Sequence, residues 1–188
     1  TDNLDIHKEK AKGEILYKSK LAEELGVPLL VPIFPRPKNN DALYTHSLDR
    51  ASLLTNIDEL RRLDLQLIAM INDSKRILSE KGINLDEKIL MSGFSASEDF
   101  TDRFTFLHPE LVEAAFIGGC ANMLPEKVLN GENLPYPIGL YDYEDLTGKE
   151  FDIALMSDVQ RYIFKGTNDE GGWYTSEENG EVTVYTGK

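Results

Sequence analysis

One short stretch, residues 89–100, limits the fold of this chain more than any other. An apolar run that predicts a buried strand ends at Gly93, and a helical pattern begins directly behind Ser95. A strand that turns sharply into a helix with a serine at the apex is a nucleophile elbow, which needs small residues two before and two after the serine. Gly93 and Ser97 occupy those places, so the motif is Gly-x-Ser-x-Ser rather than the commoner Gly-x-Ser-x-Gly.

The rest of the chain alternates between predicted helices and short apolar strands. Helical periodicity and capping glycines predict helices, and continuous apolar runs predict strands buried in a parallel sheet. This alternation predicts an α/β fold, and a length of 188 residues favours one domain over 1–188. The expected helices span 7–25, 58–81 and 96–107, with short ones at 125–129 and 148–156; the expected strands span 27–34, 88–93, 112–117 and 160–164, with a hairpin around Asn179-Gly180.

Composition excludes several classes of partner. The net charge is −13, which argues against a nucleic-acid surface because phosphate binding needs clustered Lys and Arg. No apolar run approaches the roughly 18 residues that span a bilayer, and no signal peptide is present, so no membrane partner is expected. The single cysteine, Cys120, excludes an intrachain disulfide and leaves the compartment open.

Several segments accompany the elbow in a recognisable order. They are 31–37, 44–50 and 64–71, followed by the elbow with Arg103-Phe104 and 107–109. Together they resemble the α/β-hydrolases, and more narrowly the bacterial poly(3-hydroxybutyrate) depolymerase-like esterases, over about residues 1 to 120 and loosely over 160 to 170. The resemblance implies an α/β-hydrolase-like fold, with a mainly parallel sheet flanked by helices.

The resemblance also implies a chemistry. A serine in this position, Ser95, attacks a carboxylic ester, and the backbone N–H of Ala96 supplies the first oxyanion donor. The acid that orients the catalytic histidine follows a later strand, and Asp169 matches it after the strand that ends at Phe164. The expected partner is therefore a small-molecule or polymeric ester, with no cofactor and no metal. The compartment stays open: the protein is expected to be soluble, and either cytoplasmic in bacteria or secreted with a signal peptide that this chain does not include.

The chain departs from that family at both ends. The base should follow the acid, yet no histidine follows His108. Three strands and the loop with the second oxyanion donor should precede the helix at 7–25. In the family, one of those strands lies between the strands at 27–34 and 88–93. We therefore expect an internal fragment whose sheet is incomplete at both ends, with an open seam beside the elbow strand that invites association.

Simpler interpretations stand beside these assignments. Ser95 also fits an ordinary N-cap serine. Ser97 is the next serine by type, although it better fits the small position that lets the helix pack closely. Asp169 also fits a turn residue, with Glu170 and Asp158 as weaker substitutes for the acid.

The histidines and the cysteine also have interpretations that involve no catalytic or metal-binding role. His46 follows the predicted strand at 27–34 and either approaches substrate or bonds locally within its loop. His108 fits a helix end, and His7 an exposed helix. The histidines lack zinc-ligand spacing, and Cys120 fits a buried thiol. The alternative function is a catalytically inactive hydrolase-like binding or scaffold protein, favoured by the missing histidine.

Overall fold

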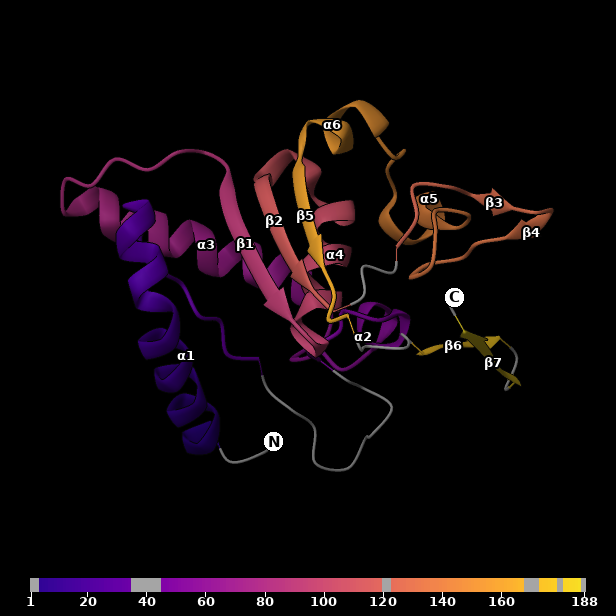
Figure 1. The fold of residues 1–188 in the computed structure, drawn as a ribbon, viewed down its shortest axis with the longest axis horizontal. Helices are drawn as coiled ribbons and strands as arrows, with labels where there is room; N and C mark the ends of the chain where they lie inside the picture. Colours follow the sequence, from indigo (N-terminus) through magenta and orange to yellow (C-terminus); the bar gives the residue numbers. More distant parts are fainter. Residues whose placement is uncertain (1–3, 35–44, 120–122, 168–172, 179–180, 187–188) are drawn as a thin grey trace. The chain divides into compact units, whose positions relative to one another are not determined.

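The computed structural model describes residues 4–34, 45–119, 123–167, 173–178 and 181–186 (Figure 1). The chain forms two compact units, Thr1–Asp86 and Glu87–Lys188. The first unit is helical, and the second contains a parallel three-stranded sheet together with helices. The fold therefore belongs to the general α/β class.

The described part of the first unit contains three helices: α1 (Leu4–Leu25), α2 (Arg50–Leu54) and α3 (Leu63–Glu80). The Asp49 carboxylate caps α2 by accepting the Ser52 N–H at 2.7 Å. Glycines in the left-handed region follow α1 and α3, at Gly26 (φ +68°) and Gly82 (φ +79°), where a side chain would be strained. Helix α1 lies where its periodicity predicted it, whereas α3 begins at Leu63, five residues after the predicted start at position 58.

The strand predicted at 27–34 is wrong. These residues are described, but they form no strand and are not part of any described sheet. Pro28 and Pro32 explain the failure, because a proline has no N–H to donate to a strand ladder. An apolar run with prolines at this spacing gives an extended segment outside the sheet.

The sheet of the second unit has the strand order β1-β2-β5 with both pairs parallel, so the carboxyl ends of all three strands share one edge. Its strands are β1 (Ile89–Phe94), β2 (Val112–Gly118) and β5 (Gln160–Phe164), each close to its predicted range.

Helix α4 (Ala96–Leu107) has the predicted bounds and packs against β1 and β2 (Figure 1). The core between them contains the buried side chains of Phe104, Ile117 and Val112. A 3-10 turn at Pro109–Leu111 then leads into β2. The predicted strand–helix–strand sequence around Ser95 is therefore confirmed.

The opposite face of this sheet carries large apolar side chains, which we call the open face: Leu90, Phe94, Phe116, Tyr162 and Phe164. The strand register brings them together in two stacked pairs, Phe94 with Phe164 at 6.4 Å and Phe116 with Tyr162 at 5.0 Å between ring centroids. Phe94 is 67% exposed and Phe164 is 53% exposed. The sheet thus has one packed face and one apolar face that is largely exposed.

The smaller elements correct two predicted helices. Residues 125–129 hold a strand, β3 (Val128–Leu129), which pairs with β4 (Glu132–Asn133) through Asn130-Gly131. Both turn residues have positive φ, as this type of two-residue hairpin needs. Of the helix predicted at 148–156, only the second half is helical, in α6 (Ile153–Asp158); a separate helix that was not predicted, α5 (Tyr143–Thr147), ends at Gly148 in the left-handed region.

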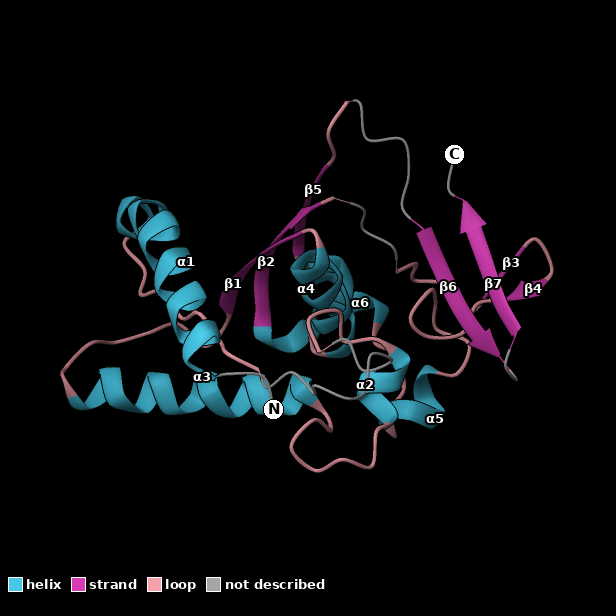
Figure 2. Ribbon diagram, turned by 90° about the horizontal axis from the view of Figure 1, so that it is seen from below, coloured by secondary structure: helices cyan, strands magenta, loops and turns pink. Residues whose placement is uncertain are grey.

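The predicted terminal hairpin is confirmed. Strands β6 (Trp173–Glu178) and β7 (Glu181–Thr186) pair antiparallel in register, with Glu178 opposite Glu181 (Figure 2). The expected turn residues, Asn179-Gly180, lie outside the described residues. Among the helices that the structure describes, none combines the length and the apolar character that crossing a membrane requires.

Candidate active site

Ser95 is the single residue between β1 and α4, and its backbone is strained. Its φ is +57° and its ψ is −129°, a region that residues with side chains rarely adopt. Such strain persists only where the surroundings enforce it, and it gathers at functional sites. The local geometry is that of a sharp strand-to-helix turn with a serine at its apex.

The residue two before the serine must be glycine. A Cβ on Gly93 would collide with the backbone carbonyl of Ser97 and would lie 2.5 Å from Thr101 Oγ1. Thr101 Oγ1 is held there because it donates to the Ser97 carbonyl at 2.9 Å. Helix α4 therefore approaches β1 more closely than any side chain at position 93 allows.

Ser97 does more than remain small. Its hydroxyl donates to the Phe94 carbonyl and accepts the Phe94 N–H, both at 2.9 Å. This pair of bonds ties the last residue of β1 to the first turn of α4 across the apex. Ser97 is thus committed to holding the turn closed, which leaves Ser95 as the serine available at the apex.

The Ser95 side chain is not used to cap α4. The Ser95-Ala-Ser-Glu98 sequence has the spacing of a capping box, in which the serine hydroxyl would accept the Glu98 N–H. Instead the Glu98 N–H donates to the Ser95 carbonyl at 2.9 Å, and Ser95 makes no side-chain cap bond. The N-cap interpretation therefore does not account for the serine hydroxyl.

The Ser95 N–H donates to the Gly118 carbonyl at the end of β2, at 2.9 Å. The next residue, Gly119, donates its N–H to the Phe164 carbonyl of β5, also at 2.9 Å. The ends of β1, β2 and β5 are therefore linked at one edge of the sheet, with Ser95 at one side of that edge.

Ala96, the expected oxyanion donor, is the first residue of α4. The first N–H groups of a helix have no intrahelical acceptor, and they carry the positive end of the helix dipole. An oxyanion formed on a substrate at Ser95 would meet this end of a 12-residue helix. The backbone at Ala96 can therefore stabilise negative charge without any cationic side chain.

A buried ion pair lies further along α4. Asp102 accepts the Met123 N–H at 3.1 Å and pairs with the Arg161 guanidinium of β5. That guanidinium also lies 4.9 Å from the centre of the Phe106 ring. These contacts join α4, β5 and the segment after β2 on the packed face of the sheet.

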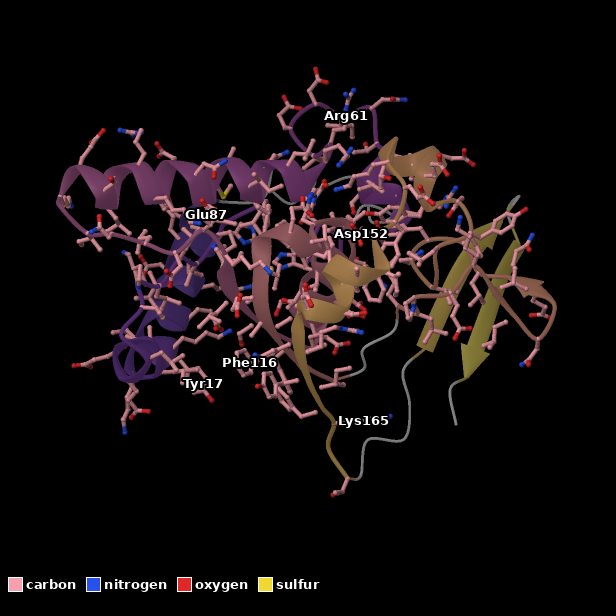
Figure 3. The ribbon with its side chains drawn as sticks, turned by 90° about the horizontal axis from the view of Figure 1, so that it is seen from above. Tyr17, Arg61, Glu87, Phe116, Asp152 and Lys165 are labelled. Carbon is pink, nitrogen blue, oxygen red and sulfur yellow. The ribbon has the colours of Figure 1, made fainter. Side chains whose placement is uncertain are left out.

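The candidate acids have different outcomes. Asp169 and Glu170 lie outside the described residues, as does Cys120. Strand β5 itself ends at the edge of the sheet that also holds Ser95, and Lys165 follows it directly (Figure 3). Asp158 ends α6 just before β5 begins, so it lies at the opposite edge and is wrong as a substitute acid.

The histidines are not brought to Ser95 within the second unit. His108 is the C-cap of α4, where it is buried beside Phe104 at 4.9 Å between ring centroids. A 12-residue helix is about 18 Å long, so His108 lies far from Ser95 and does not serve as its base. His46 lies in the turn before α2 and His7 on α1, both in the first unit.

Sequence reasoning missed Glu98, which is 5% exposed. Its carboxyl group lies against Gly119, because a Cβ on that glycine would be 3.0 Å from Glu98 Cδ and Oε2. The capping-box spacing from Ser95 was a signal for a role in the turn, but not for this partner.

No metal site emerges from the described residues, which contain no group of three or more His, Cys, Asp and Glu side chains suited to a metal ion.

Comparisons with models of protein families, with curated proteins and with solved structures found no match to the chain.

Proposed function

We propose that Ser95 is the nucleophile of a serine hydrolase that acts on carboxylic esters. The observation that carries the proposal is the backbone of Ser95, strained at φ +57° between a parallel strand and a helix N-terminus. The resemblance of the Gly-x-Ser-x-Ser stretch to the depolymerase-like esterases supports the same chemistry. The finer fold that it implies, an α/β-hydrolase-like sheet, belongs to this proposal as well.

The proposed reaction proceeds through an acyl-enzyme. Ser95 Oγ attacks the ester carbonyl carbon while its proton passes to a general base, and the carbonyl oxygen becomes an oxyanion near the Ala96 N–H. Collapse of this intermediate expels the alcohol, which takes up the proton. Water then hydrolyses the acyl-serine to a carboxylic acid and restores Ser95. Asp169 orients the base in this scheme, which needs no metal or cofactor.

Replacing Ser95 tests the proposal most directly. We expect Ser95→Ala, in the protein at its natural length, to lose ester turnover by about 10³-fold or more, because the covalent route is removed. A fluorophosphonate probe should label the parent at Ser95 and fail to label the variant. The matched control is Ser92→Ala, at an exposed serine in β1, which should keep both the ester turnover and the labelling of Ser95. Undiminished turnover in Ser95→Ala would contradict the proposal.

A specific observation favours a second candidate, an inactive hydrolase-like binding or scaffold protein. His108 lies at the far end of α4, and the other two histidines, His7 and His46, lie in the first unit. We therefore expect the 188-residue chain by itself to turn over p-nitrophenyl esters little or not at all. Robust turnover that disappears in His46→Ala would instead identify His46 as the base. Absence of turnover and of labelling in the natural-length protein would favour the scaffold.

A further inference from the structure

Glu98 is an unusual residue to find buried, because glutamate is almost never fully buried unless it is paired. It is the third residue of α4, and its N–H donates to the Ser95 carbonyl. Its side chain lies against Gly119, directly after β2. Glu98 therefore touches both sides of the turn that holds Ser95.

Gly119 is the residue that receives this side chain. Its φ of +135° suits glycine, and a Cβ there would lie only 3.0 Å from Cδ and Oε2 of Glu98. The absence of a side chain at this position therefore gives the Glu98 carboxyl group its space. The preceding residue, Gly118, accepts the Ser95 N–H, and Gly119 donates to β5. A shift of Gly119 would therefore move the acceptor that fixes the strained backbone of Ser95.

We propose that Glu98 is a positioning residue for Ser95, acting through its packing on Gly119. The carboxyl group fills the corner between α4 and β2 and keeps the Gly118 carbonyl aimed at the Ser95 N–H. This inference rests on the proposed function for its catalytic consequence, whereas the positioning itself is a property of the turn. It assigns Glu98 no contact with substrate.

Three variants separate this role from a general loss of stability. Glu98→Ala removes the packing, Glu98→Gln keeps the shape and loses the charge, and Glu98→Asp keeps the charge and shortens the side chain. Glu150→Ala, at an exposed glutamate outside the sheet, is the matched control. The natural-length protein is assayed for kcat and KM with p-nitrophenyl butyrate, and for hydrogen exchange at the Ser95 and Gly119 amides.

We expect Glu98→Ala to lower kcat about tenfold or more, because small misplacements of a reacting group are costly, while KM stays within about twofold. Exchange at both amides should become faster. Glu98→Gln should behave like the parent, and Glu98→Asp like the alanine variant. A purely structural role would lower the yield of folded protein without separating Gln from Asp.

Several results would overturn the inference. The first is a Glu98→Ala variant with the kcat and the amide exchange rates of the parent. The second is a Glu98→Gln variant that loses the parental kcat and the slow amide exchange while Glu98→Asp keeps them, which would assign the effect to the charge. If Glu98→Ala does not fold, the Gln and Asp variants decide alone. If the parent has no ester turnover, the proposed function fails, and the exchange rates still decide whether Glu98 holds the turn.

Discussion

Gly93 is the residue on which the geometry of the turn depends most directly. A methyl group there would meet the backbone of α4, which cannot move aside as a flexible side chain can. We expect Gly93→Ala to lower the free energy of unfolding by about 2–3 kcal/mol, the usual cost of overpacking. Urea unfolding followed by circular dichroism measures the change.

Gly13 provides the matched control for that substitution. It lies within α1, with nothing within 4 Å of its Cβ position. Gly13→Ala should raise the free energy of unfolding by about 0.5–1 kcal/mol, because alanine is the better helix former. Equal effects at the two glycines would show that α4 does not approach β1 as closely as described.

Asp102 allows a second test at the level of one side chain. Asp102→Ala removes the partner of Arg161 and the acceptor of the Met123 N–H, which leaves charge and a donor uncompensated in a buried place. We expect a loss of about 3 kcal/mol in the free energy of unfolding. The midpoint of urea unfolding measures this loss, and the dependence of the unfolding free energy on urea concentration should stay unchanged.

The control for Asp102 is an ion pair on the surface. Asp73 and Arg76 lie on the exposed side of α3 at 2.7 Å, and Asp73 raises the pKa of Arg76 through a hydrogen bond. Asp73→Ala should leave the midpoint almost unchanged, since exposed pairs contribute little. A comparable loss in both variants would remove the case for a structural ion pair at Asp102.

Strand β5 presents part of the open face and has a neighbour, β2, on one side within the described sheet. Exposed apolar patches at a sheet edge promote association. The double variant Tyr162→Ser with Phe164→Ser should therefore show less concentration-dependent light scattering than the parent. Tyr141→Ser, at an exposed tyrosine outside the sheet, should scatter as the parent does. Unchanged scattering in the double variant would mean that the open face does not drive association.

The elements differed in how far their sequences predicted them. Helix α4 was predicted to the residue because its apolar periodicity ends at His108-Pro109, a local signal. The strand prediction at 27–34 was wrong because the apolar character of this segment suited a strand while its prolines prevented pairing. The hairpin at Asn130-Gly131 carried a turn signal that the prediction of a helix at 125–129 overlooked.

In the candidate site, too, local sequence signals were predictive and contacts set by tertiary packing were not. Ser95 was found from the spacing of small residues around it, which is local information. The contact of Glu98 with Gly119 was not predicted, because it depends on the register between β1 and β2 and on the conformation of a single glycine. Pairing across strands is set by tertiary packing, which a single sequence does not record.

At the level of the whole molecule, the division into two units leads to a prediction about proteolysis. Lys81 is exposed and begins the connection between α3 and β1. Trypsin at low concentration should release a fragment that begins at Gly82, because cleavage favours exposed connections. Lys81→Gln should abolish that fragment while leaving other tryptic products unchanged.

The fragment that begins at Gly82 should keep its secondary structure, because the second unit contains its own buried core of Phe104, Phe106 and Ile117. Circular dichroism of the purified fragment checks this expectation. A spectrum of unfolded chain would show that the second unit needs the first in order to fold.

The hydrogen bonds that run from Ser95 to β2 and from Gly119 to β5 have a mechanical consequence. A displacement of any one of the three strand ends is transmitted to the other two through these bonds, so we expect Ser95 to move together with them. Its thermal displacement should follow that of the whole sheet edge rather than that of a loop. A ligand that displaces the carboxyl end of β5 would therefore also displace the backbone of Ser95, two strands away.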